Sequence, residues 1–250
     1  MPHYIKVSQT ASTNTYLSRL AATLPGGTVI YTPSQTAGRG QKGNSWESED
    51  GKNLTFSLLL KHPPVKARDQ FCLSEAAALA VVEALSAEAG DGFTVKWPND
   101  VYWQDKKICG MLIENSLNGS DIATCIIGIG INVNQERFVS DAPNPVSLIN
   151  VTGREHDLES LLKRVCSRIE QLASSLGDDS ARVDLHRRYM AVLYRNDGER
   201  HPFEDAAGNC FMASIAGIAP DGTLTLLHED GTTRDYLFKE IRHIINGISF

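Results

Sequence analysis

Residues 122–133, IATCIIGIGINV, constrain the fold of this chain more than any other stretch. The stretch is apolar almost throughout and rich in isoleucine, whose branched side chain favours strands. A strand without a polar face has no side to turn toward water, so it is expected at the centre of a sheet that is covered on both faces. Other elements of the chain must provide that cover.

Helix and strand patterns are mixed from Tyr4 to about Tyr194. Residues 70–90 are rich in alanine, leucine and glutamate and end in glycine, which predicts a helix with its C-terminal cap. A second helix is predicted from Asp157, as the N-cap, to Gly177, and a third from Asp184 to Tyr194. Further strands are predicted at residues 28–32, 53–60 and 108–115.

The pattern changes after Tyr194, where short strand-like runs follow one another. The pairs Asp221-Gly222 and Asp230-Gly231 separate these runs and are typical of β-hairpin turns. Residues 195–250 are therefore predicted to form a small separate β domain, and residues 1–194 the larger domain.

Composition narrows the class of protein. Hydrophobic residues make up 42% and charged residues 22% of the 250 residues, as in an ordinary soluble globular protein. The net charge of -6 offers no general attraction for nucleic acid, and nucleic acid is not expected as a partner. The five cysteines are odd in number, scattered and without a CxxC pair, which indicates reduced thiols in a cytoplasmic protein. The N-terminus lacks a signal peptide and no apolar stretch is long enough to span a bilayer, so no membrane is expected.

The loop TAGRGQKGNSW, residues 36–46, combines three glycines with two cations and a tryptophan. Its glycines spell GxGxxG, but a turn and a strand follow where a dinucleotide fold would need a helix. Asn44 stands where a P-loop would need lysine, and no kinase signature appears downstream. On composition alone, a flexible surface loop with chance charges is an equally good interpretation.

A second cluster, KWPNDVYWQDKKICG at residues 96–110, changes that balance. Lys96, Asn99, Asp100 and Lys107 surround Trp97-Pro98, and a turn at residues 104–106 would fold the segment into a hairpin. If it stood alone, a charged hairpin tip with Trp97 in the core would be the better interpretation. Two such clusters in one domain indicate a site for an anionic, partly flat ligand.

Together these segments resemble biotin protein ligases. GRGQKGNSW is similar to the biotin loop of that family, KWPND to its central signature, KKICGMLIE to its catalytic-lysine strand and GIGINV to a later strand. STN at residues 12–14 and Gln35 match as well, and the order and rough spacing are kept over about the first 135 residues. The resemblance implies an α+β fold, in which a mixed β-sheet catalytic domain with helices packed against it precedes an SH3-like β-barrel.

The resemblance also implies a two-step reaction. The carboxylate of biotin attacks the α-phosphate of ATP to give biotinyl-AMP and pyrophosphate, and a lysine of a biotin carboxyl carrier protein domain then attacks the mixed anhydride. ATP, Mg²⁺ and biotin are the implied ligands, a tightly bound prosthetic group is not expected, and a homodimer is compatible with the family. A glycine-rich lid would protect the anhydride from water.

Site residues follow from matching motifs. Lys107 and Arg39 are the implied catalytic cations, since charge develops on the carboxylate and phosphate oxygens. The biotin-binding set is Ser12, Thr13, Asn14, Gln35, Gly38, Arg39, Gly40, Gln41, Lys107 and Gly110. The ATP-binding set is Arg39, Trp46, Lys96, Asn99, Asp100, Lys107 and Asn132. No metal ligand is assigned.

Some of these residues have a second interpretation. The ureido ring of biotin has one acceptor and two donors, which the hydroxyls of Ser12 and Thr13 and the amide of Gln35 can match. Ser12 is also a suitable N-cap for a helix. Trp46 can give adenine an aromatic face or pack in the core, and the glycines of the GIGINV strand can equally serve close backbone packing.

Two features depart from the family. Gln41 stands where some members carry arginine, and Lys42 is the neighbouring cation that could compensate. Bifunctional members carry a DNA-binding domain before the catalytic motifs, whereas these motifs begin close to Met1 here, so a repressor function is not expected. The alternatives are a lipoate or octanoate ligase, which needs a greasier pocket, and a catalytically silent sensor of biotin or biotinyl-AMP, which would not require both Arg39 and Lys107.

Overall fold

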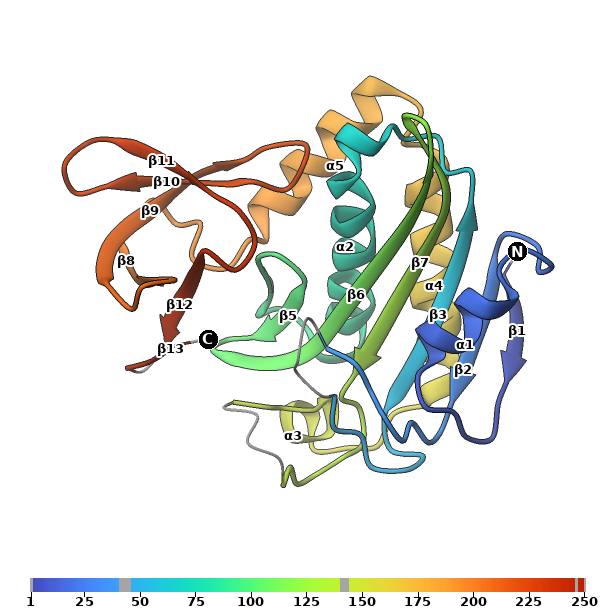
Figure 1. Cartoon of the computed structure of the whole chain (residues 1–250). Coiled ribbons are helices and arrows are strands. Elements are labelled where there is room, and N and C mark those ends of the chain that lie inside the picture. Colours follow the sequence, from blue (N-terminus) through green and yellow to red (C-terminus); the bar gives the residue numbers. More distant parts are fainter. Residues whose placement is uncertain (1, 41–45, 140–143, 246, 250) are drawn as a thin grey trace.

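The computed structural model describes residues 2–40, 46–139, 144–245 and 247–249. In this part of the chain seven strands form a mixed sheet in the order β1-β2-β3-β7-β6-β5-β4 (Figure 1). The strands are β1 (His3–Lys6), β2 (Thr28–Thr32), β3 (Leu54–Lys61), β4 (Phe93–Lys96), β5 (Asp100–Trp103), β6 (Lys106–Asn118) and β7 (Asp121–Ile131). Only β1 and β2 pair in parallel among these described strands. The predicted central strand is confirmed, because β7 lies in the middle of the sheet.

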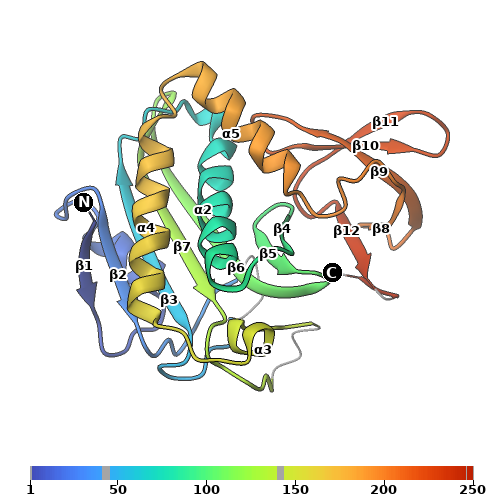
Figure 2. The ribbon, with the colours of Figure 1, turned by 180° about the vertical axis from the view of Figure 1, so that it is seen from behind.

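Helices cover the two faces of the sheet unequally. They are α1 (Thr13–Leu20), α2 (Phe71–Ala89), α3 (Leu148–Thr152), α4 (Leu158–Ser174) and α5 (Asp179–Ala191), with a 3-10 turn at Ala67–Asp69. α2 and α4 lie across the back face (Figure 2), where Ile127 and Ile129 of β7 join the main core. On the front face α1 covers only Ile126 and its neighbours. The remainder of the front face, where β7 carries glycines, is left for a site.

Local sequence explains the helix ends. Gly90 ends α2 with a positive φ of 78°, and Asp157 caps α4 by accepting hydrogen bonds from the amides of Glu159 and Ser160, so both predictions are confirmed. Ser12 caps α1, as expected. The third helix begins at Asp179 and not at Asp184, because Asp178 accepts from the Ser180 amide and caps it earlier.

The prediction that no apolar stretch reaches the length of a membrane span is wrong. Residues Ala67–Ala89 are long and apolar enough by length and composition, and they form the only such helix within the described ranges. In the fold 72% of that apolar window is buried. Its alanines and leucines pack against the sheet and against α4, as in a core helix.

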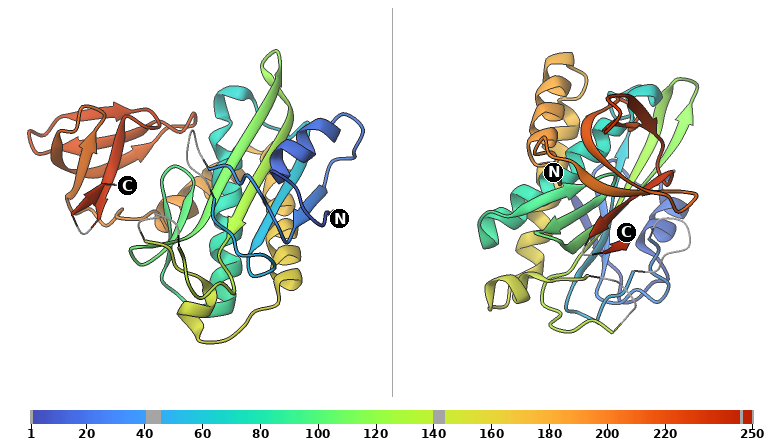
Figure 3. Two further views of the ribbon diagram at one scale, coloured as in Figure 1. Left: turned by 60° about the horizontal axis from the view of Figure 1, so that its bottom comes forward. Right: turned by 90° about the vertical axis from the view of Figure 1, so that its left-hand side faces the viewer.

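The chain after α5 forms an antiparallel sheet, here called the terminal module (residues 201–249). As far as the structure describes it, the sheet has six strands in the order β11-β10-β9-β8-β12-β13, at one side of the larger sheet (Figure 3). They are β8 (His201–Asp205), β9 (Cys210–Ile218), β10 (Leu224–His228), β11 (Thr233–Tyr236), β12 (Ile241–Ile245) and β13 (Ile248–Ser249). Both predicted hairpin turns are confirmed, since Gly222 and Gly231 adopt positive φ between consecutive strands. The arrangement is compatible with an SH3-like barrel.

The two parts share one core. Phe203, Leu224 and Leu226 of the terminal module belong to the same hydrophobic cluster as α2 and the central strands. The predicted boundary between residues 194 and 195 falls in the segment between α5 and β8, and it stays a prediction.

Candidate active site

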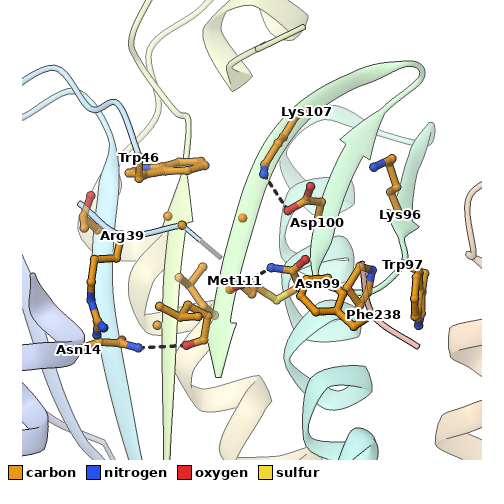
Figure 4. Close-up of a pocket in the computed structure, with 18 of the residues that line it drawn as sticks. Asn14, Arg39, Trp46, Lys96, Trp97, Asn99, Asp100, Lys107, Met111 and Phe238 are labelled. Carbon is orange, nitrogen blue, oxygen red and sulfur yellow. Dashed lines mark hydrogen bonds and ion pairs between the residues drawn. The ribbon is translucent and has the colours of Figure 1, made fainter. Parts of the chain in front are cut away.

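A cavity of about 510 Å³ opens on the front face of the large sheet (Figure 4). Its walls come from the start of α1, the segment around Arg39 and Trp46, the hairpin of β5 and β6, strand β7, and the segment from Phe238 to His243 of the terminal module. In Figure 4, Asn14 and Arg39 lie on one side, Lys96, Trp97 and Phe238 on the other, and Lys107 between them. The cavity therefore has two ends with a cation between.

Lys107 and Asp100 form an ion pair in the middle of the cavity. The Lys107 Nζ lies 2.8 Å from the Asp100 Oδ1, and both side chains are largely shielded, with 34% and 16% exposed. The backbone of Lys107 is held on both sides, because its N–H donates to Asn144 O and its carbonyl accepts from Val146 N. The hairpin thus presents a fixed cation whose only counter-charge in the cavity lining, among the described residues, is Asp100.

Arg39 is anchored by a residue that the sequence did not suggest. Its Nη2 lies 3.1 and 3.2 Å from the two carboxylate oxygens of Glu114 on β6. The same carboxylate accepts a 2.8 Å hydrogen bond from Asn14 Nδ2. Glu114 therefore ties the glycine-rich segment to the start of α1. The one clue in the sequence is spacing, since Glu114 lies two residues after Leu112 and so on the same face of β6.

A network under the start of α1 fixes the orientation of polar groups. Asn14 Nδ2 donates to Leu112 O at 3.1 Å as well as to Glu114, so both of its N–H bonds are engaged. Ser57, fully buried on β3, lies 2.5 Å from Asn14 Oδ1 and 2.8 Å from Thr13 Oγ1. Gln35 Oε1 accepts from Thr13 N at 3.0 Å. Ser57 was not among the predicted residues, and nothing in its local sequence marks it.

Glycines form the floor of the cavity. Gly110 of β6 pairs with Gly130 of β7, and Leu112 pairs with Gly128. The Trp46 ring lies over Gly130, where an added methyl group would meet ring atom Cζ2 at 2.7 Å. A methyl group at Gly128 would overlap the side-chain amide of Asn14. Close packing of side chains on bare backbone, one of the two interpretations given for these glycines, is confirmed.

Lys96 is the buried cation of the second end. It is 7% exposed, and its Nζ lies 5.4 Å from the centre of the Tyr102 ring. Burial lowers the pKa of Lys96 to about 8. The charges of Lys107 and Arg195 also lower this pKa, and the charge of Asp100 raises it. A group with a pKa near 8 loses its charge within the range in which enzymes are assayed.

The terminal module closes this end with residues that sequence reasoning missed. Phe238, Lys239, Arg242 and His243 line the cavity. His243 is 3% exposed, and neither ring nitrogen has a hydrogen-bond partner among the residues described. Burial holds the pKa of His243 well below its usual value, and Lys96 and Arg195 lower it further, so its ring is neutral. No local pattern could reveal these residues, because tertiary packing alone brings the module to the cavity.

Most of the predicted site residues come together in this cavity. Those that line it are Ser12, Thr13, Asn14, Gln35, Arg39, Gly40, Trp46, Lys96, Asn99, Asp100, Lys107 and Gly110. Gly38 lies just behind the lining, where its carbonyl accepts from Trp46 N at 3.1 Å. Asn132 is buried away from it and donates from Nδ2 to Val146 O at 3.1 Å, which holds the segment beside Lys107. Gln41 lies outside the described residues. The individual roles stay predictions.

The donor set suits a metal ion only in part. Within residues 2–40, 46–139, 144–245 and 247–249 no group of three or more His, Cys, Asp or Glu side chains could hold one. Asp100 offers one carboxylate at the cavity. One or two carboxylates are the usual protein share of a Mg²⁺ ion that is otherwise held by substrate phosphates and water.

Comparison with known proteins gives a consistent result. Residues 7–132 match the model of the biotin/lipoate A/B protein ligase family. A biotin-[acetyl-CoA-carboxylase] ligase from Paracoccus denitrificans is 34% identical over 162 residues, which cover 62% of this chain and 67% of that protein. The bifunctional ligase/repressor BirA from Bacillus spizizenii is 35% identical over 146 residues, 56% of this chain. That match spans only 44% of the bifunctional protein.

The fold has a solved counterpart over nearly its whole length. The biotin protein ligase from Aquifex aeolicus, solved in complex with biotin and ATP, superimposes with a TM-score of 0.80 at 28% identity. The alignment covers 97% of this chain and all of that chain. The mixed sheet and the terminal module therefore occur together in a protein of known structure.

Proposed function

We propose that this chain, which belongs to the biotin/lipoate A/B protein ligase family, is an ATP-dependent biotin protein ligase. It would activate biotin as biotinyl-AMP and pass the biotinyl group to a lysine of a carrier protein. The observation that supports this most strongly is the placement of Lys107 between a polar end and a cationic end of one cavity. Activation of a carboxylate by ATP requires a cation at that meeting point.

The polar end suits a ureido ring. Both N–H bonds of Asn14 are engaged by Leu112 and Glu114, and its Oδ1 accepts from Ser57 Oγ, so the second lone pair of Oδ1 is left to accept from a ligand N–H. Ser12 Oγ accepts from Thr15 N, so its O–H can donate to a ligand carbonyl. An alkyl or dithiolane tail would offer no partner to the Ser12 O–H or to the second lone pair of Asn14 Oδ1, at a cost of up to about 1–3 kcal/mol for each. The hydrogen-bond set thus favours biotin over octanoate or lipoate.

The opposite end suits a nucleotide polyphosphate. Lys96, Lys239 and Arg242 surround it with positive charge, and Lys107 borders it. Trp46 lies on the other side of Lys107 from Lys96, with its ring over Gly130 and the ring centre 5.9 Å from the Lys107 Nζ, and it offers an aromatic face for adenine beside that cation. Mg²⁺ would arrive with ATP and neutralise phosphate charge, with Asp100 as the carboxylate within the cavity that could share the ion.

The chemistry then follows from position. A carboxylate oxygen of biotin attacks the α-phosphorus, the bond to the bridging oxygen of the β-phosphate breaks, and pyrophosphate leaves. Lys107 and Arg39 stabilise the charge that develops on the oxygens of the carboxylate and the α-phosphate. In the second step the carrier amine attacks the acyl carbon of the anhydride, and AMP leaves. Alignment of the two reactants alone can supply about 7–11 kcal/mol of the barrier reduction.

Two further parts of the proposal concern partner and place. The acceptor would be a biotin carboxyl carrier protein or domain, because the anhydride needs a lysine presented from outside the cavity. A cytoplasmic location is supported by the cysteines, since all five are free and four of them are buried.

The experiment that tests the function is pyrophosphate exchange into ATP by the purified protein. Biotin, lipoate and octanoate are each supplied as the only carboxylic acid, with Mg²⁺ present. We expect exchange with biotin alone. Exchange driven by another acid would keep the mechanism and change the substrate, and a folded protein that supports no exchange would be a sensor and not an enzyme.

A further inference from the structure

The indole of Trp97 connects the central signature of the larger domain to the terminal module. Trp97 directly follows β4 and is 3% exposed. Its Nε1 donates a 2.9 Å hydrogen bond to the carbonyl oxygen of Gly222, which lies in the turn between β9 and β10. The bond joins residues that are 125 positions apart in the sequence.

The receiving turn is shaped to sit there. Gly222 has a φ of 95°, a conformation that favours glycine, and an added methyl group would lie 2.7 Å from the Phe71 ring. Phe71 N also donates to Pro220 O at 3.3 Å. The turn therefore rests on the start of α2 with its carbonyl pointing to Trp97.

A second contact links Trp97 to the segment that closes the cavity. The rings of Trp97 and Phe238 meet edge to face, with centroids 6.2 Å apart and planes at 70°. Phe238 precedes Lys239, Arg242 and His243, which line the nucleotide end. On the other side of Trp97, Asn99 exchanges hydrogen bonds with Met111 through its side chain and its carbonyl, and Asp100 pairs with Lys107. The Trp97 side chain thus contacts the terminal module, and Asn99 and Asp100, which follow it in the chain, line the cavity.

We propose that Trp97 is a positioning residue that holds the terminal module against the nucleotide end of the cavity. The inference rests on the proposed function, in which that end receives ATP. The ring of Trp97 borders the cavity, but its Nε1–H points to Gly222 and not into the cavity. Trp97 would therefore affect ATP binding through the module residues that line the cavity, namely Phe238, Lys239, Arg242 and His243.

The test compares Trp97→Phe with Trp103→Phe. Both changes remove an indole N–H and keep an aromatic ring, but Trp103 is not among the residues that line the cavity. For Trp97→Phe we expect the KM for ATP to rise about fivefold, the change that follows from losing one hydrogen bond of ordinary net strength. The KM for biotin should stay near that of the parent, and Trp103→Phe should leave both values unchanged.

A second readout does not depend on activity. Arg200 is exposed in the segment that joins α5 to β8, and trypsin can cleave there when the module loosens. Cleavage should be faster in Trp97→Phe than in Trp103→Phe. If Trp97→Phe does not fold, Phe238→Ala replaces it in the comparison with Trp103→Phe, because it removes the module's ring from the same contact. Phe238 is 42% exposed, so its truncation spares the core.

The outcomes separate the two proposals. A parent protein without biotin-dependent exchange would overturn the ligase function, while the trypsin comparison would still judge the role of Trp97. An active parent whose Trp97→Phe variant shows an equal rise in both KM values, or unchanged KM and unchanged cleavage, would overturn the positioning role.

Discussion

At the scale of single residues, the ion pair of Lys107 with Asp100 is the feature closest to the proposed chemistry. Replacing Lys107 with alanine removes the cation at the point where carboxylate and phosphate meet. We expect biotin-dependent exchange to fall by about 10²–10³-fold, as when one preorganised stabilising group is lost. Stability should fall far less than activity, because 34% of the Lys107 side chain is exposed and Asp100, the partner left behind, keeps the charge of Lys96 nearby.

Lys106→Ala provides the matched control for that measurement. Lys106 is the exposed neighbour on the same strand and points away from the cavity lining. Equal losses in the two variants would mean that the position of the cation does not matter, which contradicts the assignment.

Lys96 predicts a pH dependence of ATP use. Its pKa is lowered to about 8, mainly by burial, so the side chain is charged below that pH and neutral above it. Because the charged form attracts phosphate, kcat/KM for ATP should fall as the pH rises through about 8 in the free enzyme.

The profile of Lys96→Met tests this assignment. Methionine has a similar length and no charge at any pH, so the variant should show a lower kcat/KM for ATP without the fall near pH 8. If the parent and the variant have the same alkaline limb, another group is responsible.

How far the sequence predicts the site also depends on the residue. Arg39, Lys107 and Asp100 belong to short motifs whose charges are visible in the sequence, and the structure brings them to one cavity. Glu114 and Ser57 could not be predicted, because their roles arise from hydrogen bonds to residues that lie 43 to 100 positions away. Asn132 was predicted to bind ATP because it belongs to a motif, but it lies behind the cavity. Its side chain supports the segment next to Lys107.

At the scale of elements, the two faces of strand β7 have different roles. Its isoleucines at 127, 129 and 131 fill the core on the back, while Gly128 and Gly130 leave room on the front. Gly130→Ala should displace the Trp46 ring and raise the KM for ATP, and Gly128→Ala should displace Asn14 and raise the KM for biotin. Overpacking typically costs about 1–3 kcal/mol, which corresponds to roughly a tenfold change for each.

Gly217→Ala is the matched control on strand β9. An added methyl group there meets nothing within 4 Å, so both KM values should remain those of the parent. The same KM pattern in Gly128→Ala and Gly130→Ala would show that the two glycines do not serve different ends of the cavity.

Elements were predictable where their own sequence carries the cause. α2 and α4 follow from alanine and leucine content and from the caps at Gly90 and Asp157. The start of α5 at Asp179 was missed, because only the structure shows that Asp178 accepts the amide hydrogen bond from Ser180 and caps the helix there. The apolar stretch Ala67–Ala89 was overlooked in the sequence, and length and composition alone do not assign it, since burial in a core and burial in a bilayer select the same side chains.

At the scale of the whole molecule, the site is completed across the seam between two parts of the chain. The β character of residues 195–250 was visible in the turn pairs, but their position was not. Trp97, Phe71 and Phe238 make the contacts that fix this position, and aromatic residues of this kind look like ordinary core residues in a sequence. The continuous core through Phe203 and Leu226 shows that the module is packed onto the larger sheet as part of one fold.

The division of the cavity has a consequence for how such a protein can change over time. The end near α1 is built from residues 12–14, Gln35, Arg39 and Ser57 with β6 and β7, whereas the end near the module depends on residues 96–100 and 238–243. Few of these residues are shared between the two ends, so we expect substitutions at one end to have little effect on the other. The specificity for the carboxylic acid could therefore change during evolution while the ATP-binding end stays the same. A laboratory library of variants at Ser12, Asn14 and Ser57 would test new carboxylic acids without altering the residues of the nucleotide end.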